Sequence, residues 1–578
     1  MLILRKLLLV SVMALLCSSV MKAAQPKAEV RSMWIATVWQ IDWPASAGTS
    51  TSTANSQKKQ MSTIIGDMAR GNYNAIYFQV RPNCDAFYKS KFEPWSNYLT
   101  GSRGTAPSYD PLQYVVEQCH ANNMECHAWV NPMRFSTGSN YNTPNDQDMK
   151  NRGWLLKHGN TTIMNPGLPE VRQRIVDVCR DIIENYDVDG IVFDDYFYPS
   201  NIPTNSSAGD YNLWKKSGTS NFADWRRENV NKVIKQVYDM IQQVKPYVKF
   251  GVSPRGIAGT SQKVADKYGV PRCTSGSDSQ YDQIFCDPLA WLKAGSVDYI
   301  SPQIYWARGF SSGDFSILTP WWANVASKFR RHFYTSHSLE YFKDANKTSR
   351  EKNFAGMAEQ VKINRNVTKN NAPGAIFYSY SCIKNKTENS KDYFEYLGAN
   401  VFSTKALTPA ITWKRAPAQG KVQNMKLTRS QLSWDKVDNV RYAVYVLPAC
   451  SAHDSKLLTA ENLVAHTYNN KVNLKAEQIK GEVAVTIVDR YGNEYAPQWL
   501  GELSGVENIA ADAMTVRISD GQAFFNQILD TVEVYDAAGK LIASAQNCNS
   551  VNLRNFSGIV FVKMNANGLV KTEKSLIE

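Results

Sequence analysis

The sequence predicts an α/β protein: a (β/α)8 barrel of the TIM type, followed by two small β-sandwich domains. Two observations predict the barrel. Short β-branched or aromatic runs alternate with helical stretches from Val30 to about residue 400, and there are eight such runs. A third observation predicts the β-domains, because past Pro417 the chain consists mainly of short strand-like runs separated by polar turns.

The barrel strands are predicted from apolar runs of four to eight residues. They are expected at residues 31–38, 75–80, 125–130, 190–193, 250–253, 299–304, 333–336 and 375–378. Between them, apolar residues recur every three or four positions, most clearly after Pro169 and again from Val230 to Val244, which predicts amphipathic helices. No Gly-x-Gly-x-x-Gly follows the first run, so no dinucleotide site and no cofactor are expected.

We expect four segments along the chain: a signal peptide at 1–24, the barrel at 28–400, and β-domains at 420–503 and 504–578. In the first β-domain, Trp434, the Tyr442-Ala443-Val444-Tyr445 run and a later Asp-x-x-Gly-Asn-Glu turn resemble a fibronectin type III domain; an unrelated sandwich is the alternative. The last segment resembles the sorting-type modules found at the carboxyl end of exported proteins of the Bacteroidota, with strand-like runs at 531–535 and 557–563.

The amino terminus has the pattern of a secretory signal peptide. Arg5 and Lys6 precede an apolar run at 7–16, and the small residues Ala23 and Ala24 follow. The run is shorter than the ~20 residues that a membrane span needs, so the mature chain is expected to lack a transmembrane segment. We therefore expect export to the periplasm, the outer surface or the medium, with lipid attachment at Cys17 as an alternative.

Charge and cysteine content exclude several classes of function. The formal net charge of +13 is spread along the chain without blocks of like charge, which argues against a nucleic-acid partner and is compatible with an acidic glycan. None of the ten cysteines forms a Cys-x-x-Cys pair, and no His-rich ligand spacing occurs, so no metal site is predicted.

The most informative motif is the pair of adjacent carboxylates at the end of the fourth predicted strand. Alternation along 190–193 places Asp194 on the face of Gly190 and Val192, which would be the barrel interior, and Asp195 on the opposite face. Carboxylates at the carboxyl end of a barrel strand are typical of active sites, and glycoside hydrolysis uses two acids. We therefore expect Asp194 to act as nucleophile or general base. The alternative is that the pair caps a turn or binds a cation.

Polar and aromatic side chains at other strand ends are expected to converge on the same mouth and bind substrate. These residues are Gln79, Arg81, His127, Trp129, Asn131, Arg134, Gln303, Tyr305 and Trp306. For each one alone, and for His127 above all, a hydrogen bond within the core or a loop is the alternative.

Several independent motifs together resemble the glycosyl hydrolase-like 10 family over residues 28–400. They are Arg31-Ser32-Met33-Trp34-Ile35-Ala36-Thr37, Gln79-Val80-Arg81-Pro82 with Asp85-Ala86-Phe87-Tyr88, Pro94-Trp95-Ser96 with Leu99-Thr100-Gly101, His127-Ala128-Trp129 with Asn131-Pro132, Phe193-Asp194-Asp195-Tyr196-Phe197-Tyr198-Pro199 and Pro302-Gln303-Ile304-Tyr305-Trp306. The resemblance implies a (β/α)8 barrel with glycosidase activity, with bacterial cell-wall glycan among the substrates suggested for the family. Where the family more usually has an aromatic residue, this chain has Arg255.

The general acid is left open by the sequence, with Asp85, Asp195 and Glu340 as candidates. The leading hypothesis is an exported glycoside hydrolase that acts on an oligosaccharide or polysaccharide. A noncatalytic glycan-binding protein of the cell envelope is the alternative. A metal-dependent hydrolase using Asp194 and Asp195 is a third reading that no ligand spacing supports.

Overall fold

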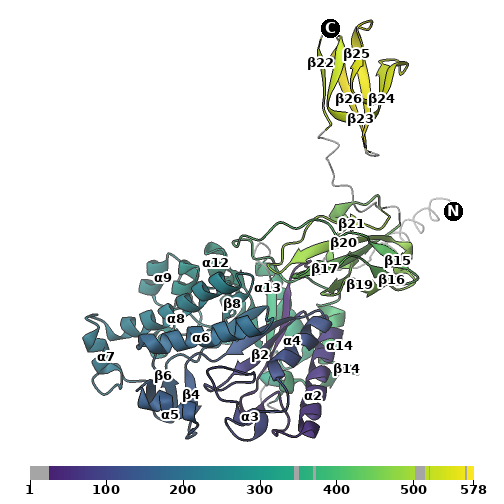
Figure 1. The fold of residues 1–578 in the computed structure, drawn as a ribbon. Coiled ribbons are helices and arrows are strands. Elements are labelled where there is room, and N and C mark those ends of the chain that lie inside the picture. The colour runs from purple at the N-terminus through teal and green to yellow at the C-terminus, as the bar shows by residue number, and fades with distance from the viewer. Residues whose placement is uncertain are drawn as a thin grey trace, which may run out of the picture. The chain divides into compact units, whose positions relative to one another are not determined.

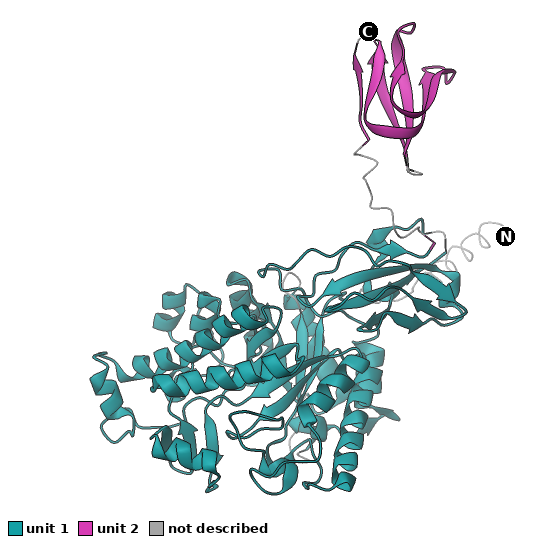
Figure 2. Ribbon diagram, viewed as in Figure 1, with its two compact units in different colours: residues 1–500 teal, residues 501–578 magenta. Residues whose placement is uncertain are grey.

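The computed structural model divides into two compact units, residues 1–500 and 501–578, each described here by itself (Figure 2). The structure describes residues 25–343, 351–368, 373–449, 451–501, 514–519, 521–566 and 569–577. The predicted signal peptide lies outside these residues.

The first unit contains a nearly closed parallel barrel with strand order β10-β9-β8-β7-β3-β2-β1-β12-β11 (Figure 1). The strands are β1 (Val30–Ile35), β2 (Ala75–Arg81), β3 (Glu125–Val130), β7 (Gly190–Phe193), β8 (Lys249–Val252), β9 (Tyr299–Ile300), β10 (His332–Phe333), β11 (Thr335–Ser338) and β12 (Gly374–Tyr378). β10 and β11 are two parts of one stretch separated by Tyr334; β10 pairs with β9 and β11 with β12, all in parallel. The eight predicted barrel strands are therefore all present.

Helices surround this sheet on its outer side (Figure 1). The longer ones are α2 (Thr51–Arg70), α4 (Pro111–Ala121), α6 (Pro169–Asn185), α8 (Phe222–Val244), α12 (Phe315–Lys328), α13 (Phe354–Val367) and α14 (Tyr393–Asn400). Shorter ones are α3 (Asn97–Thr100), α5 (Pro144–Asn151), α7 (Tyr211–Lys216), α9 (Gln262–Tyr268), α10 (Ser279–Gln283) and α11 (Pro288–Ala294). Polar side chains cap the first turns of several of these helices. The Asp110 carboxylate accepts a hydrogen bond from the Gln113 N–H at the start of α4, and the Asn221 side chain accepts one from the Asp224 N–H at the start of α8.

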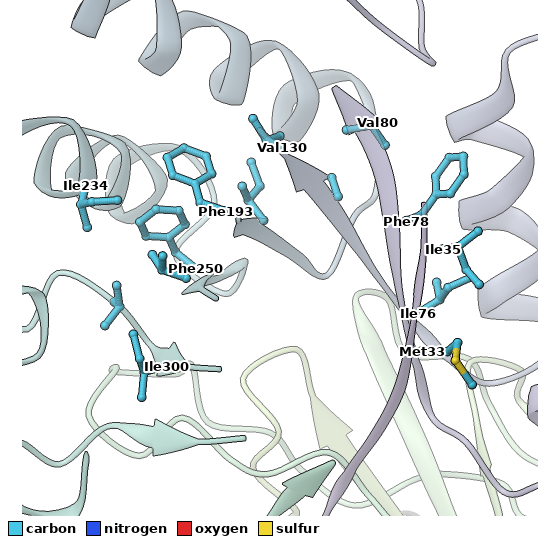
Figure 3. Packing of buried hydrophobic residues seen from close by; sticks show 14 of the residues in the cluster. Met33, Ile35, Ile76, Phe78, Val80, Val130, Phe193, Ile234, Phe250 and Ile300 are labelled. Carbon is cyan, nitrogen blue, oxygen red and sulfur yellow. The ribbon is translucent and has the colours of Figure 1, made fainter. Parts of the chain in front are cut away.

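Alternation along the strands separates two apolar layers. Phe193 and Phe250 meet edge to face at 5.1 Å on the helix side, in one cluster with Ile234 of α8 (Figure 3). A different cluster, which includes Trp34, Tyr77, Trp129, Val192 and Tyr299, fills the barrel interior.

Glycines on two strands make room for these large rings. A Cβ at Gly251 would lie 2.0 Å from the Tyr299 ring, and one at Gly190 would lie 2.4 Å from His127. The lower barrel is therefore a packed core.

An antiparallel sheet of three strands is inserted after β3. Its strands are β4 (Arg134–Thr137), β5 (Leu155–His158) and β6 (Thr161–Met164), in the order β4-β6-β5. This insertion brings the side chains of Arg134, His158 and Thr161 to the cavity described below.

The chain after the barrel forms seven strands in two antiparallel sheets. The strands are β15 (Lys426–Thr428), β16 (Gln431–Ser433), β17 (Val440–Leu447), β18 (Leu463–Thr467), β19 (Lys471–Asn473), β20 (Glu482–Asp489) and β21 (Gln498–Trp499), in the orders β15-β16-β19 and β18-β17-β20-β21. Leu432, Trp434, Tyr442 and Val485 form the core between the sheets. This β-domain belongs to the same compact unit as the barrel.

Buried ion pairs attach the β-domain to the amino-terminal ends of the barrel strands. The Glu125 carboxylate at the start of β3 accepts from Arg441 of β17 and from Lys249 of β8, each at 2.7 Å. Burial alone would raise the pKa of Glu125, but the charges of Lys249 and Arg441 hold it well below its usual range. Arg490 pairs with Asp189 at 3.1 Å in the same interface.

The second unit is a single antiparallel sheet of five strands. They are β22 (Val516–Ser519), β23 (Gln522–Asp536), β24 (Leu541–Asn552), β25 (Gly558–Ala566) and β26 (Leu569–Ile577). β23 is long enough to pair with β22, β24 and β25, and its residues Val532 and Val534 lie in the unit's core. This unit corresponds to the second predicted β-domain, at 504–578. Within the residues described, no helix has the length and apolar character of a membrane span.

Candidate active site

Asp194 follows β7 directly, two residues after Val192 of the interior cluster. Its side chain is largely buried, with the residue only 7% exposed. The Oδ1 atom accepts a hydrogen bond from the Asp195 backbone N–H at 2.8 Å and another from Gln303 Nε2 at 2.8 Å. Gln303 lies just beyond β9, so two strand ends of the barrel hold this carboxyl group.

Asp195 does not point away from Asp194, in contrast to the expectation from alternation. Its Oδ1 lies 3.4 Å from the same Gln303 Nε2 atom, and its Oδ2 accepts from Arg255 Nε at 3.2 Å. Both residues lie beyond β7, which ends at Phe193, so contacts with Gln303 and Arg255 set the direction of the Asp195 side chain.

The two carboxyl groups have opposite electrostatic surroundings. Burial raises the pKa of Asp194 well above its ordinary value, and the negative charge of Asp195 raises it further. Asp195 instead forms an ion pair with Arg255, whose guanidinium also donates to Ser200 Oγ at 3.0 Å and Ser279 Oγ at 3.3 Å. The site therefore combines a carboxyl group of raised pKa with a second one that has a cationic partner.

Two tyrosines and a glutamate lie on the same side of the barrel. Tyr305 and Tyr378 stack with ring centroids 5.9 Å apart and an interplanar angle of 20°. Burial raises the pKa of both phenols, and the negative charges of Asp194 and Glu340 contribute to this in each case. Glu340 begins a short 3-10 helix, Glu340–Phe342, and its side chain is exposed. Glu340 is thus an exposed carboxyl group whose charge acts on the same two tyrosines as that of Asp194.

A cavity of about 310 Å³ lies beside Asp195. It is lined by Arg134, His158, Thr161, Ile163, Asp195, Tyr196, Phe197, Tyr198, Pro199, Ser200, Arg255 and Ile284. The Arg134 guanidinium lies over the Tyr196 ring, 3.4 Å from its centroid. The cavity thus has cationic walls and shares Asp195 with the carboxylate pair. No cluster of three or more His, Cys, Asp or Glu side chains suited to a metal occurs in the described part of the chain.

A family model described as glycosyl hydrolase-like 10 matches residues 29–354, which is more than half of the chain. The chain belongs to this family. Glycosyl hydrolase YngK of Bacillus subtilis (strain 168) is 34% identical over 416 residues, covering 71% of this chain and 79% of the relative. Glycosyl hydrolase DigH of Escherichia coli (strain K12) is 34% identical over 330 residues, covering 54% and 73%.

Among solved structures, the glycoside hydrolase domain of PgaB (BpsB) from Bordetella bronchiseptica aligns at 12% identity with a TM-score of 0.39. The alignment covers 62% of this chain and 96% of that chain. The family assignment supports glycoside hydrolase-type chemistry on a carbohydrate, and the barrel topology agrees with it.

Several residues predicted to bind substrate serve this glycosyl hydrolase-like 10 barrel in other ways. Gln79 Oε1 accepts from the backbone N–H groups of Thr37 and Val38, at 2.9 and 2.8 Å, and so holds the loop after β1. Arg81 pairs with Glu93 at 2.8 Å and donates to the Asn131 carbonyl at 2.7 Å. These contacts tie the loops after β2 and β3 together beneath the mouth.

Three further predicted residues are buried in the interior. His127 stacks on Tyr77 and contacts Glu125 at 3.1 Å and the Tyr299 hydroxyl at 3.0 Å, near the base of the barrel. Trp129 Nε1 donates a hydrogen bond to Asn131 Oδ1 at 2.9 Å, so the buried indole N–H and the amide oxygen are partners. Because neither His127 nor Trp129 is more than 3% exposed, these contacts position the core instead of a ligand.

Of the three candidates for the general acid, Asp85 is the one enclosed by protein. It is fully buried and forms an ion pair with Arg103 at 3.2 Å, while its Oδ1 accepts from the Asn83 N–H. Burial raises the pKa of Asp85 as well, yet this carboxyl group stabilises a loop.

Trp306, predicted to bind substrate, is half-buried. Its ring lies 2.7 Å from the position that a Cβ at Gly313 would take.

Two residues that sequence reasoning missed also shape the site. Tyr378 is the last residue of β12 and shares the inward face with Ile376, so strand parity alone would have placed it at the mouth. The ring of Tyr196 lies under the Arg134 guanidinium. This contact joins β4 to the loop after β7, and no local sequence pattern predicts it.

Proposed function

We propose that this protein is a glycoside hydrolase that cleaves O-glycosidic bonds of an oligosaccharide or polysaccharide, with Asp194 and Asp195 as its reacting groups. The observation that carries the proposal is the pair itself, in which burial and the neighbouring charge raise the pKa of Asp194 while Asp195 pairs with Arg255. Family membership supports the same reaction class.

The roles differ from those expected from sequence. Asp194, expected as nucleophile or base, has a raised pKa and therefore suits the general acid. In the first step the proton of this acid moves to the glycosidic oxygen as its bond to the anomeric carbon breaks, and an oxygen of Asp195 bonds to that carbon. In the second step Asp194 takes a proton from water, and the water oxygen displaces Asp195. The Arg255 guanidinium stabilises Asp195 when it leaves as a carboxylate.

The test is release of reducing ends from a glycan panel that includes peptide-free cell-wall glycan, α-glucans and host glycans. We expect the mature protein to release them and Asp194→Asn to lose at least ~100-fold in rate, the usual contribution of a general acid. Asp239→Asn, which alters an exposed carboxylate of α8, is the matched control and should retain full activity. Release that persists in Asp194→Asn would contradict the assignment.

The substrate proposed first is a glycan of the bacterial cell wall, because the family resemblance implies it and because the amino terminus has an export pattern. Export itself, and the identification of 420–503 as fibronectin type III-like and of 504–578 as a sorting-type module, are part of the same proposal. The two sheets of the first β-domain support the fibronectin type III-like assignment. Fractionation of cells that produce either the full chain or a chain ending at residue 500 tests the sorting-type assignment.

One observation favours a noncatalytic glycan-binding protein as the second candidate. Asp195 is already paired with Arg255, which lowers the reactivity of its carboxylate in the absence of substrate. Tight binding of a panel glycan with no release by the unaltered protein would favour this alternative.

A further inference from the structure

A large aromatic side chain lies in solvent at the rim of the barrel. Trp39, four residues after the end of β1, is 60% exposed, which is the largest exposed fraction among the large apolar side chains described in the first unit. Its ring belongs to none of the apolar clusters formed by the described residues of that unit. Tryptophan stabilises cores and interfaces by burying a large apolar area, so this ring contributes little to the packing of the barrel.

The backbone at Trp39 is left-handed, with φ 51° and ψ 17°, and Gln40 follows with φ 57°. Glycine adopts this region without strain, whereas a bulky side chain there costs free energy because its Cβ approaches a carbonyl oxygen. Strain of this kind clusters at sites where proteins bind ligands or react with them. The chain therefore holds an exposed indole in a conformation that favours neither packing nor the local backbone.

Buried side chains hold this turn from both ends. Gln79 fixes its start through the two backbone hydrogen bonds described above. Just after the turn, Asp42 accepts from the Ala36 N–H at 2.8 Å with Oδ2 and from Ser379 Oγ at 2.9 Å with Oδ1. The backbone that carries Trp39 is thus fixed by the fold itself, which lowers the entropic cost of binding a ligand there.

Trp39 and Asp194 follow different strands of the barrel, and Tyr378 lies near both. β1 is separated from β7 by β2 and β3, and its other neighbour is β12, which ends in Tyr378. The negative charges of Asp42 and Asp194 both contribute to the raised pKa of Tyr378, whose ring stacks on Tyr305. A glycan bound at Asp194 can therefore extend past the two tyrosines to the rim at Trp39.

We propose that Trp39 is a stacking platform for a sugar ring of the bound glycan, at a position removed from the bond that is cleaved, so that the preferred substrate is a chain of several sugar residues. The C–H face of a pyranose is apolar and can cover an indole, and this contact does not depend on the charge of the sugar. The inference rests on the proposed function for the place of the cleaved bond, but the stacking contact itself can be measured without turnover.

The test compares the affinities of long chains and disaccharides of the same glycan. The probes are peptide-free cell-wall glycan, separated by chain length, and uncharged chains of β-linked N-acetylglucosamine. Binding is measured by calorimetry on the full mature chain carrying Asp194→Asn, which suppresses turnover. We expect Trp39→Ala in this background to weaken binding of long chains of at least one probe about tenfold, because an aromatic contact and the area that it buries are lost. The affinity for the disaccharide should not change.

Two further variants separate ligand binding from a structural role. Trp39→Phe keeps an aromatic face and should retain most of the long-chain affinity. Trp39→Gly should lose this affinity as Trp39→Ala does, yet it should melt at the same temperature as the unaltered protein or higher, because glycine removes the left-handed strain. If the indole served the fold, both small substitutions would instead lower the melting temperature.

Phe524→Ala is the matched control. Phe524 is an aromatic residue of β23 in the second unit and is 42% exposed, so its replacement also removes an exposed ring. This variant should bind long chains and disaccharides as the unaltered protein does.

The outcomes separate this inference from the proposed function. Long chains of both probes that bind no more tightly than disaccharides, long-chain affinity that survives Trp39→Ala, an equal loss for disaccharides, or a lower melting temperature of Trp39→Gly would each overturn the platform. Release of reducing ends by a protein whose long-chain affinity is independent of Trp39 would leave the hydrolase and remove the platform. Long-chain binding that depends on Trp39, in a protein that releases no reducing ends, would leave the platform and remove the hydrolase.

Discussion

Asp194 and Asp195 are neighbours in the chain, yet their environments differ because one lies inside the barrel and the other at its rim. Strand parity predicts that Asp194 faces inward, and Gln303, three residues beyond β9, contacts both carboxyl groups through Nε2. No local pattern predicted that Arg255 would reach Asp195, since the two are 60 residues apart in the chain.

The raised pKa of Asp194 predicts how its replacement alters stability. The folded protein binds a proton at Asp194 more tightly than the unfolded chain does. The free energy of unfolding therefore falls as the pH rises from the ordinary aspartate pKa toward the pKa of Asp194 in the folded protein. Asp194→Asn removes this penalty while its amide oxygen can still accept from the Asp195 N–H and Gln303.

We therefore expect Asp194→Asn to have a higher melting temperature than the unaltered protein at pH 7, with the difference shrinking at pH 4. Thermal unfolding at both values checks this, and Asp239→Asn should show no such gain. A variant less stable at pH 7 than at pH 4, relative to the unaltered protein, would mean that Asp194 is ionised in the fold.

The distance between the two carboxyl groups predicts the stereochemistry of hydrolysis. One nitrogen contacts both Oδ1 atoms, at 2.8 and 3.4 Å, so these two oxygens are at most about 6 Å apart, which is short of the ~6.5–9.5 Å of inverting enzymes. We expect the first-formed product to retain its anomeric configuration, as followed by NMR during the reaction. Inversion would instead implicate the exposed Glu340 as the second carboxyl group, and Glu340→Gln would then be the inactive variant.

At the level of single elements, the barrel depends on pairing small residues on one strand with large rings on the next. Gly251 on β8 faces the Tyr299 ring of β9, and Tyr299 is 1% exposed, so it has no free space to move into. Sequence periodicity located both strands, but it carries no information about which side chains of neighbouring strands face each other.

Gly251→Ala is expected to destabilise the barrel by about 1–3 kcal/mol, because the new methyl group overpacks a filled interior. Gly66→Ala is the matched control: Gly66 lies in α2 with open space around its Cβ position, so the same change should stabilise the protein by about 0.5–1 kcal/mol. Chemical denaturation measures both. Equal effects of the two substitutions would show that the strand interior is not tightly packed.

At the level of the whole molecule, the β-domain and the barrel share a charged interface. Glu125 of the barrel is the common partner of Lys249 and of Arg441 from the β-domain, and all three side chains are at most 3% exposed. The sequence predicted a separate domain at 420–503, and it offered no sign that this domain would supply a cation to the base of the barrel.

Glu125→Gln should cost about 3–5 kcal/mol, because it leaves two buried cations without their counter-charge. Glu184→Gln, which alters an exposed pair with Arg180 on α6, should cost less than ~1 kcal/mol. The pKa of Glu125 is lowered in the fold, so its contribution is present above the ordinary glutamate pKa and lost as pH falls through the folded value. The difference in free energy of unfolding between Glu125→Gln and Glu184→Gln should therefore become smaller when unfolding is measured at successively lower pH.

A double variant, Glu125→Gln with Arg441→Met, tests whether the two residues act as a pair across the interface. We expect it to lose less than the sum of the single changes, because removing Arg441 relieves one of the unpaired cations. Strict additivity would show that the β-domain contributes nothing to the charge balance at the barrel base.

The sequence by itself determined the eight strands, the helices between them and the position of Asp194 at a strand end, because these follow from apolar periods of two and three to four residues within short segments. The tertiary structure alone decided that Asp195 lies beside Gln303, that Arg255 pairs with it, that Arg134 stacks on Tyr196 in the cavity, and that His127 contacts Glu125 in the barrel core. Each of these depends on contacts between residues from different elements, and the same burial raises the pKa of Asp194.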